Sequence, residues 1–310
     1  MNIGLGIAIP TYNRSELLND LLNSIPEAAP VWVSDNGGLT EKGKINRNVN
    51  LEFSGCADVI PMFSNWNRAA RLVTPDQSHV IIPSDDDKYL AGGLEHIRDI
   101  LVQNPEADMI VCGCDLIDES GSVFHTYRPE RDEILVGEPA FRKFIKGVDA
   151  RMPAIAFKRT TFEKLGGLDS SFELTAADSD LVQRCALNGK VVFSTTVVGQ
   201  YRVWRGSLTH AKIASDQWMA EIEKWLKKID VELDNGSLDL QADWRKARAE
   251  IAARNLLSAI GLLYAGKRYE ELIQFRKKYP IPAGASLRTV ISIARRSFVS
   301  RLKILATRHC

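Results

Sequence analysis

Hydrophobic positions in the first 112 residues alternate between short apolar runs and helical stripes. The apolar runs predict buried strands, because a strand covered on both faces is apolar along its whole length. These runs cover residues 3–10, 30–36, 51–54, 79–83 and 108–114. Apolar residues recur at helical spacing over residues 15–25, 63–73 and 94–104. The alternation predicts an α/β, Rossmann-like fold whose sheet is mainly parallel and binds ligands beyond the carboxyl ends of its strands.

The pattern changes near residue 115. A hairpin is predicted around Glu119 to Gly121, followed by strands and helices of a mixed rather than purely parallel arrangement. Beyond residue 214 only helical spacing is found. We therefore expect one domain over residues 1–213, made of the halves 1–112 and 113–213, and an all-helical region over residues 214–310.

The last helical segment, residues 286–308, is both amphipathic and basic. It carries six cations and no acidic residue. Its apolar residues at helical spacing are Leu287, Val290, Ile291, Ala294, Phe298, Leu302 and Leu305, and its cations are Arg288, Arg295, Arg296, Arg301, Lys303 and Arg308. Such a helix lies on an anionic membrane surface, or it packs on its own protein and exposes a solvated basic face. The sequence leaves both interpretations open.

Overall charge and cysteine usage exclude several classes of protein. Forty Lys and Arg residues face 39 Asp and Glu residues, so no nucleic-acid partner is indicated. The five cysteines form neither a disulfide framework nor a paired CxxC metal motif. The N-terminus does not resemble a signal peptide, and no apolar run approaches the roughly 18 residues that span a bilayer. We expect a cytoplasmic protein, with any membrane contact peripheral, on the inner face of the cell membrane.

The apolar run at residues 79–83 leads, after Ser84, into three adjacent aspartates, Asp85, Asp86 and Asp87. Neighbouring carboxylates repel one another and raise each other's pKa unless a cation lies between them. Magnesium and manganese ions take one or two carboxylates and complete their shells with water and phosphate oxygens. The alternatives are a solvated turn or a helix cap. A metal site with a diphosphate ligand is favoured only together with the neighbouring loops.

Two further strand ends carry groups suited to a nucleotide. Pro10 to Arg14 supply a hydroxyl, a phenol, an amide and a cation, and Asp35 with Asn36 follow the next strand. A nucleoside diphosphate needs a carboxylate for base or ribose, an aromatic face and a cation near phosphate. No Gly-rich phosphate loop follows the first strand, which argues against a dinucleotide enzyme or a P-loop protein.

Five segments, taken in order and spacing, resemble family 2 glycosyltransferases of the A-type (GT-A) fold. They are IAIPTYNRSELLNDLLNSI, VWVSDNGG, NWNRAA, IIPSDDD, and FKRTTFEKLGGLDSSF with AADSDLVQRCALNGK. The resemblance covers about residues 3 to 205, and the helical region beyond has no match. It implies a nucleotide-binding half followed by an acceptor-binding half.

The resemblance implies a nucleotide site at the strand ends. Asp85 matches the carboxylate that approaches the ribose, and the other matching positions are Pro10, Thr11, Tyr12, Arg14 and Asp35. Asn36, Ser84 and Arg68 lie beside them and complete the predicted site. Arg68 is one turn from Arg71 and either reaches phosphate or lies on a solvated face.

The metal ligand implied by the resemblance, for Mn²⁺ or Mg²⁺, is Asp86, or Asp87 if the register slips by one. The register is open because SDDD departs from the commoner DxDD. The family often completes this site with a histidine, where this chain has Trp204 and, six residues later, His210. Either His210 serves as the ligand or the protein supplies none there. A separate interpretation of Trp204 is that its ring stacks on a sugar.

Asp178 matches the family's catalytic base, with Ala177 in place of the usual Glu and Asp180 as a second candidate. The implied reaction is inverting, metal-dependent transfer of a sugar from a nucleotide donor, foremost a UDP-sugar, to a hydroxyl of a glycan or lipid-linked acceptor. Bacterial surface polysaccharide or lipopolysaccharide assembly is the implied setting. The alternatives are a non-catalytic scaffold of that assembly and a sugar nucleotidyltransferase, which would need a Gly-rich loop that PTYNR does not provide.

Overall fold

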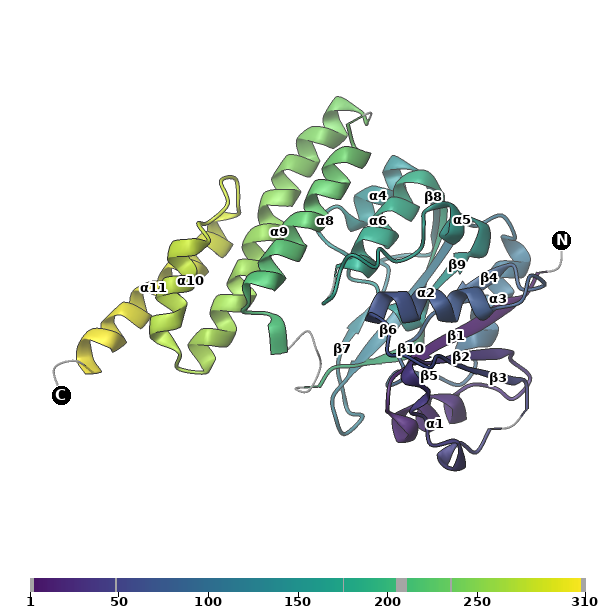
Figure 1. Ribbon diagram of the computed structural model, residues 1–310. Helices are drawn as coiled ribbons and strands as arrows, with labels where there is room; N and C mark the ends of the chain where they lie inside the picture. The colour runs from purple at the N-terminus through teal and green to yellow at the C-terminus, as the bar shows by residue number, and fades with distance from the viewer. Residues whose placement is uncertain (1–2, 48, 175, 205–210, 235, 308–310) are drawn as a thin grey trace. The chain divides into compact units, whose positions relative to one another are not determined.

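The computed structural model describes residues 3–47, 49–174, 176–204, 211–234 and 236–307. Contacts between residues divide the chain into two compact units. Unit 1 consists of Met1–Phe141, Val148–Glu173 and Leu181–Trp204, and unit 2 of Arg142–Gly147, Leu174–Asp180 and Arg205–Cys310. Figure 1 shows strands gathered in the first unit and helices in the second.

A single mixed sheet forms the framework of unit 1. Among the described residues it has ten strands, with the central order β3-β2-β1-β4-β9-β6-β10-β5, while β7 pairs with β6 and β8 with β10. The strands are β1 (Leu5–Thr11), β2 (Val31–Asp35), β3 (Leu51–Gly55), β4 (His79–Ile81), β5 (Lys88–Tyr89), β6 (Met109–Ile117), β7 (Val123–Tyr127), β8 (Glu133–Val136), β9 (Ile155–Lys158) and β10 (Lys190–Arg202).

Strand direction changes across the sheet. Strands β3, β2, β1 and β4 are parallel to one another, whereas β9 runs antiparallel to both of its neighbours, β4 and β6. Strand β10 is parallel to β6 and antiparallel to β8 and β5. The parallel half matches the alternating pattern of the first 112 residues, and the mixed half matches the change of pattern after residue 115.

Helices cover the sheet of unit 1 (Figure 1). Helix α2 packs against β1 and β2, and α3 packs against β10 and β6. The α-helices that begin before residue 190 are α1 (Ser15–Ser24), α2 (Met62–Leu72), α3 (Gly93–Gln103), α4 (Glu138–Phe144), α5 (Arg159–Lys164) and α6 (Ala177–Asn188), and the short 3₁₀ turns are η1 (Asn36–Gly38), η2 (Lys42–Lys44) and η3 (Met152–Ala154).

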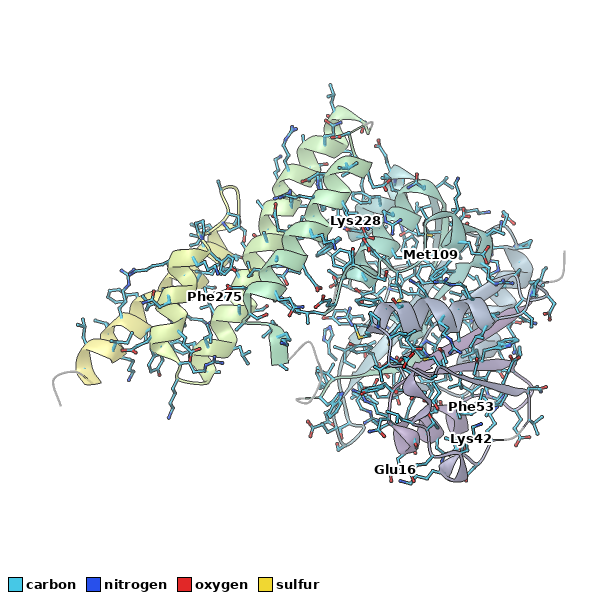
Figure 2. All side chains as sticks on the ribbon, viewed as in Figure 1. Glu16, Lys42, Phe53, Met109, Lys228 and Phe275 are labelled. Carbon is cyan, nitrogen blue, oxygen red and sulfur yellow. The ribbon has the colours of Figure 1, made fainter. Side chains whose placement is uncertain are left out.

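The core of unit 1 follows from the apolar strands. Every residue of β1 and β2 is buried, because both faces of the central sheet are covered. Met109 at the start of β6 is also buried, and Phe53 on β3 packs at the edge of the core; both are labelled in Figure 2. Because these strands are apolar, the polar residues lie mainly at the strand ends and in the loops that follow. The candidate site lies there.

Unit 2 is helical in its described part beyond residue 210. It contains α8 (Asp216–Glu232), α9 (Leu238–Ala265), α10 (Tyr269–Lys278) and α11 (Leu287–Thr307). Ser215 and Ser237 cap α8 and α9 by accepting hydrogen bonds from backbone amides of the first turn. Helices α9, α10 and α11 share an apolar core around Ile260 and Ile293. No helix in the described residues has the length and apolar character required to cross a bilayer.

Candidate active site

Three parallel strands end at one edge of the sheet and carry the predicted nucleotide residues there. Thr11 is the last residue of β1 and is in register with Asp35, the last residue of β2. Strand β4 lies on the other side of β1, and the aspartates follow it after a short loop. The carboxyl edge of β2, β1 and β4 therefore brings Thr11, Asp35 and Asp85 into one region, as the alternating pattern predicts.

Asp85 is buried against the end of β1. Its Oδ2 accepts hydrogen bonds from Thr11 Oγ1 at 2.8 Å and from the Tyr12 amide at 3.4 Å, and its Oδ1 lies 3.2 Å from Arg14 Nη1. Burial raises the pKa of Asp85 to about 6, with the neighbouring charge of Asp86 acting in the same direction. The carboxylate is therefore held in place by β1 at a cost in free energy.

Arg14 lies between two carboxylates and an aromatic ring. Its Nη1 is 3.2 Å from Asp85 Oδ1 and 3.2 Å from Asp86 Oδ2. Its guanidinium carbon lies over the ring of Trp204, 5.1 Å from the ring centroid. A cation in this position attracts both carboxylates and the ring face. Trp204 stands where the resemblance implies a histidine, and stacking on a sugar was one interpretation of it; in the structure the Arg14 guanidinium lies over its ring.

Asp87 is turned into the protein. Its Oδ2 accepts a hydrogen bond from the Ser84 amide at 2.8 Å, and its Oδ1 accepts one from the Arg202 amide at 3.3 Å. Burial raises the pKa of Asp87 well above its usual range, and the charge of Asp86 adds to the effect. Asp87 closes the loop that presents Asp85 and Asp86.

Arg202 at the end of β10 holds the same loop from the other side. Its Nε donates to the backbone oxygen of Asp86 at 3.0 Å, and its Nη1 donates to the backbone oxygens of Asp118 and Glu119 at 3.1 and 3.2 Å. Sequence reasoning did not assign Arg202 to the site. The signal in the sequence was the Tyr201–Arg202 pair, which the family resemblance implies at this place and which lies beyond the predicted strand at residues 191–194.

Asp35 offers a buried acceptor. Its Oδ2 accepts a hydrogen bond from the Thr40 amide at 3.0 Å. Its Oδ1 is buried, and no group in the described part of the chain hydrogen-bonds to it. A buried acceptor without a donor is costly, and such a group indicates a ligand donor. Tyr12 is 51% exposed at the end of β1, so its ring is accessible to a ligand.

Arg68 and Asn65 on α2 form hydrogen bonds with the strands of this edge. Arg68 donates to Ser34 Oγ at 2.6 Å and to Ser54 Oγ and backbone oxygen at 2.6 and 2.7 Å, tying β2 to β3. Asn65 accepts from Ser34 Oγ at 2.6 Å and donates to the backbone oxygen of Thr11 at 3.4 Å. We infer that both position the strand ends; Asn36 similarly exchanges hydrogen bonds with the backbone of Ile60.

The donors at this edge fit a divalent cation that takes few protein ligands. No group of three or more metal-binding side chains exists among the described residues. Asp85 and Asp86, however, direct one oxygen each at the same nitrogen of Arg14, which stands in for a cation between them. Magnesium and manganese ions need only one or two carboxylates when substrate phosphates complete the shell. Pro10 lies in β1, in register with Ser34 of β2, and Ser84 lies in the loop after β4.

The predicted catalytic base belongs to unit 2. Asp178 is in the first turn of α6, is partly exposed, and accepts a hydrogen bond from the Ser179 amide at 2.7 Å. Asp180, the second candidate, is fully buried and lies 2.9 Å from Lys228 Nζ of α8 (Lys228 is labelled in Figure 2). Asp180 is thus held in a buried ion pair, whereas Asp178 is accessible in part. His210 lies outside the described residues.

Comparison with known proteins gives the fold a wider context. No protein-family model matches the chain, and no curated protein matches its sequence. Among solved structures it is similar to TarS from S. aureus, with 13% identity, a TM-score of 0.62 and coverage of 98% of this chain and 92% of that one. The complex of TarS with UDP-GlcNAc has 15% identity, a TM-score of 0.61 and coverage of 98% of this chain and 92% of that one.

A second similar structure comes from another organism. It is the mannosyltransferase PcManGT from Pyrobaculum calidifontis in complex with GDP-Man and Mn²⁺, with 17% identity, a TM-score of 0.53 and coverage of 95% of this chain and 86% of that one. These structures are glycosyltransferases, and the likeness confirms the predicted GT-A fold with its helical extension. Only the fold follows from identities this low.

Proposed function

We propose that the protein is a glycosyltransferase that moves a sugar from a nucleotide donor, foremost a UDP-sugar, to a hydroxyl of a glycan or lipid-linked acceptor. The observation that carries the proposal is the meeting of Thr11, Arg14 and the Asp85–Asp86 pair at the carboxyl edge of the sheet in a GT-A fold. Complexes of two similar structures with UDP-GlcNAc and GDP-Man support a nucleotide-sugar donor.

The nucleoside end of the donor is assigned to the first two strand ends. Asp35 Oδ1 is a buried acceptor without a donor among the described residues, and an N–H of the base would satisfy it. The exposed ring of Tyr12 is placed to cover a base face. Asp85, next to Thr11, is the carboxylate for a ribose hydroxyl.

The diphosphate end is assigned to Asp86 and Arg14. Asp86 is the proposed ligand of a Mn²⁺ or Mg²⁺ ion, because Asp87 is turned inward and bonded to the Ser84 and Arg202 amides. When bound, the ion would neutralise the charge that develops on the leaving diphosphate. Arg14 carries a fixed positive charge at the same place and is suited to a phosphate oxygen.

Asp178 is the proposed base. Its carboxylate takes the proton of the acceptor hydroxyl while that oxygen bonds to the anomeric carbon, and the bond from this carbon to the diphosphate oxygen breaks. The nucleoside diphosphate leaves with the bonding electrons, and attack from the face opposite to it inverts the anomeric centre. The family resemblance supports this role, together with a setting in surface polysaccharide or lipopolysaccharide assembly.

A binding experiment followed by an activity assay tests the proposal. We expect calorimetry to detect UDP binding in the presence of Mn²⁺, and a panel that includes UDP-GlcNAc and GDP-mannose to reveal one donor that releases its nucleoside diphosphate. Asp86→Asn should abolish the Mn²⁺ dependence, whereas the exposed Asp99→Asn on α3 serves as the control and should leave it unchanged. Absence of nucleotide binding with or without the ion would overturn the assignment, and binding without any turnover would favour the scaffold.

A further inference from the structure

Helix α11 has two apolar faces, and the described residues of the chain pack against one of them. Ile293 and Ser300 are fully buried, and Thr289 Oγ1 donates to Glu250 of α9 at 2.6 Å. The opposite side carries five large apolar residues that are 49% to 74% exposed. We call these residues the α11 stripe: Leu287, Ile291, Phe298, Leu302 and Leu305.

The α11 stripe is narrow and continuous along the helix. At about 100° per residue, its five members fall within about 60° of one another around the axis. The packed residues Ile293 and Ser300 lie on the other side of the axis by the same construction, so the stripe is not an edge of the core. Isolated exposed apolar residues are ordinary, whereas a row of five along one helix is a surface that binds something apolar.

Cations flank the stripe and no acid lies on the helix. Arg288 and Arg295 lie on one side of the stripe and Arg301 on the other, at about 100° per residue. After Glu271 the chain contains nine Lys and Arg residues and no Asp or Glu. Burial lowers the pKa of Arg276 of α10, and the positive charge of Arg301 on α11 acts in the same direction.

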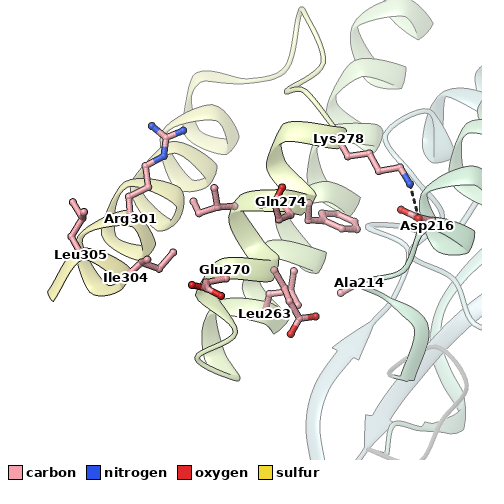
Figure 3. Close-up of a pocket in the computed structure, with 12 residues that line it drawn as sticks. Ala214, Asp216, Leu263, Glu270, Gln274, Lys278, Arg301, Ile304 and Leu305 are labelled. Atoms are coloured by element: carbon pink, nitrogen blue, oxygen red, sulfur yellow. Dashed lines mark hydrogen bonds and ion pairs between the residues drawn. The ribbon is translucent and has the colours of Figure 1, made fainter. Parts of the chain in front are cut away.

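The apolar surface continues into a hollow of about 880 Å³ beside the end of α11 (Figure 3). Leu305 and Arg301 line it together with the apolar residues Leu263, Ile273 and Phe275. The acids Asp216, Glu270 and Glu271 also line the hollow; Glu271 is paired with Arg268 at 2.5 Å, and Asp216 with Lys278 at 2.6 Å. The hollow offers room for an apolar chain next to the stripe.

We propose that the α11 stripe docks onto the surface of an anionic phospholipid bilayer. The apolar residues enter the boundary between headgroups and acyl chains, and the flanking arginines meet lipid phosphates. The observations favour a bilayer over a protein partner because an apolar row with cations on both sides and no acid matches an anionic, laterally uniform surface. Such docking would bring the chain to a lipid-linked acceptor, but the proposal does not depend on catalysis.

Sedimentation of the full chain with vesicles tests the proposal. We expect binding to an equal mixture of phosphatidylcholine and phosphatidylglycerol, weak binding to phosphatidylcholine alone, and loss of binding as salt screens the charges. Phe298→Ser with Leu302→Ser should lower partitioning at least about tenfold. The matched control is Val231→Ser with Leu238→Ser, which removes two exposed apolar residues elsewhere in unit 2 and should leave partitioning unchanged.

A second pair of variants tests the cations. Arg288→Gln with Arg295→Gln should weaken partitioning about 25-fold, at about fivefold for each charge near an anionic surface. The control is Arg245→Gln with Lys246→Gln, two exposed cations of α9. All of these side chains are exposed, so circular dichroism and the Tm should stay at wild-type values.

Three outcomes would overturn the proposal. One is wild-type protein that stays in the supernatant with anionic vesicles at low salt. Another is equal loss of binding in the stripe variant and its control. The third is a dimer in light scattering that becomes a monomer on Phe298→Ser with Leu302→Ser, since the stripe would then be an interface between two copies of the chain.

Discussion

The guanidinium of Arg14 lies over the ring of Trp204, 5.1 Å from its centroid, while its Nη1 is 3.2 Å from both Asp85 and Asp86. One cation thus links the first strand end, the aspartate loop and the end of β10. The arrangement explains how adjacent carboxylates persist in a buried loop, since the positive charge offsets part of their repulsion.

The energy of the Arg14–Trp204 contact is measurable by a double-mutant cycle. Arg14→Met should lower the free energy of unfolding at neutral pH by about 1 to 3 kcal/mol, because Asp85 and Asp86 lose their cation. We expect a coupling energy of about 0.5 to 1 kcal/mol between Arg14→Met and Trp204→Ala in urea unfolding. Arg131→Met removes an exposed cation and is the control. A coupling energy of zero would show that the stacked pair has no energetic consequence.

Because of Asp85, the free energy of unfolding should fall as the pH rises from about 4 to about 6. Its folded pKa of about 6 is higher than the ordinary value of 3.8, so the native state binds more protons than the unfolded state within this window. The free-energy cost of burying the ionised Asp85 carboxylate is absent below this pH window and fully present above it. Asp85→Asn should therefore raise the free energy of unfolding by about 1 to 3 kcal/mol at pH 7 and leave it nearly unchanged at pH 4. Urea titrations at both pH values measure this, and a gain of equal size at pH 4 would contradict it.

Asp35 should contribute directly to nucleotide affinity. Asp35→Asn places an N–H donor among groups that need an acceptor, so we expect UDP binding to weaken at least about tenfold in calorimetry. Asp58 is an exposed carboxylate in the loop after β3, and Asp58→Asn is the matched control. If both variants bound UDP like wild type, the buried Oδ1 would have no part in the site.

The two aspartates of α6 should differ in what their loss changes. Asp178→Asn should lower kcat by about 10²- to 10⁴-fold with an unchanged Tm, as expected for a base that is partly exposed. Asp180→Asn should lower the Tm, because it removes the buried charge that pairs with Lys228. If kcat were unchanged in Asp178→Asn, another residue would be the catalytic base.

The sequence predicted the elements whose hydrophobic patterns are local. Strands β1, β2, β4 and β6 were predicted because buried strands are continuously apolar, and α11 because its stripe repeats at helical spacing. Strand β8 was missed because its four residues alternate between partial burial and exposure, and β5 because it has two residues. The position of β9 between β4 and β6 depends on pairing between distant segments, which no local pattern encodes.

The sequence predicted which strand ends carry polar residues, but not how their side chains are oriented. Three equal aspartates do not reveal which one turns inward; that depends on the Ser84 and Arg202 amides that bond to Asp87. Arg68 was expected at phosphate or in solvent, whereas its hydrogen bonds join the ends of β2 and β3. Each outcome depends on a partner outside the local pattern, Arg202 for Asp87 and Ser34 for Arg68.

The order of strands in the sheet bears on how the protein is made. One edge of β6 is covered by β10, and the start of its other edge by β9, so both partners leave the ribosome after β6. A nascent chain that ends before residue 155 exposes apolar strand edges without neighbours, and such edges promote aggregation. We therefore expect expression of residues 1–112 alone to give insoluble material. Productive folding requires the last strand, β10, to be synthesised.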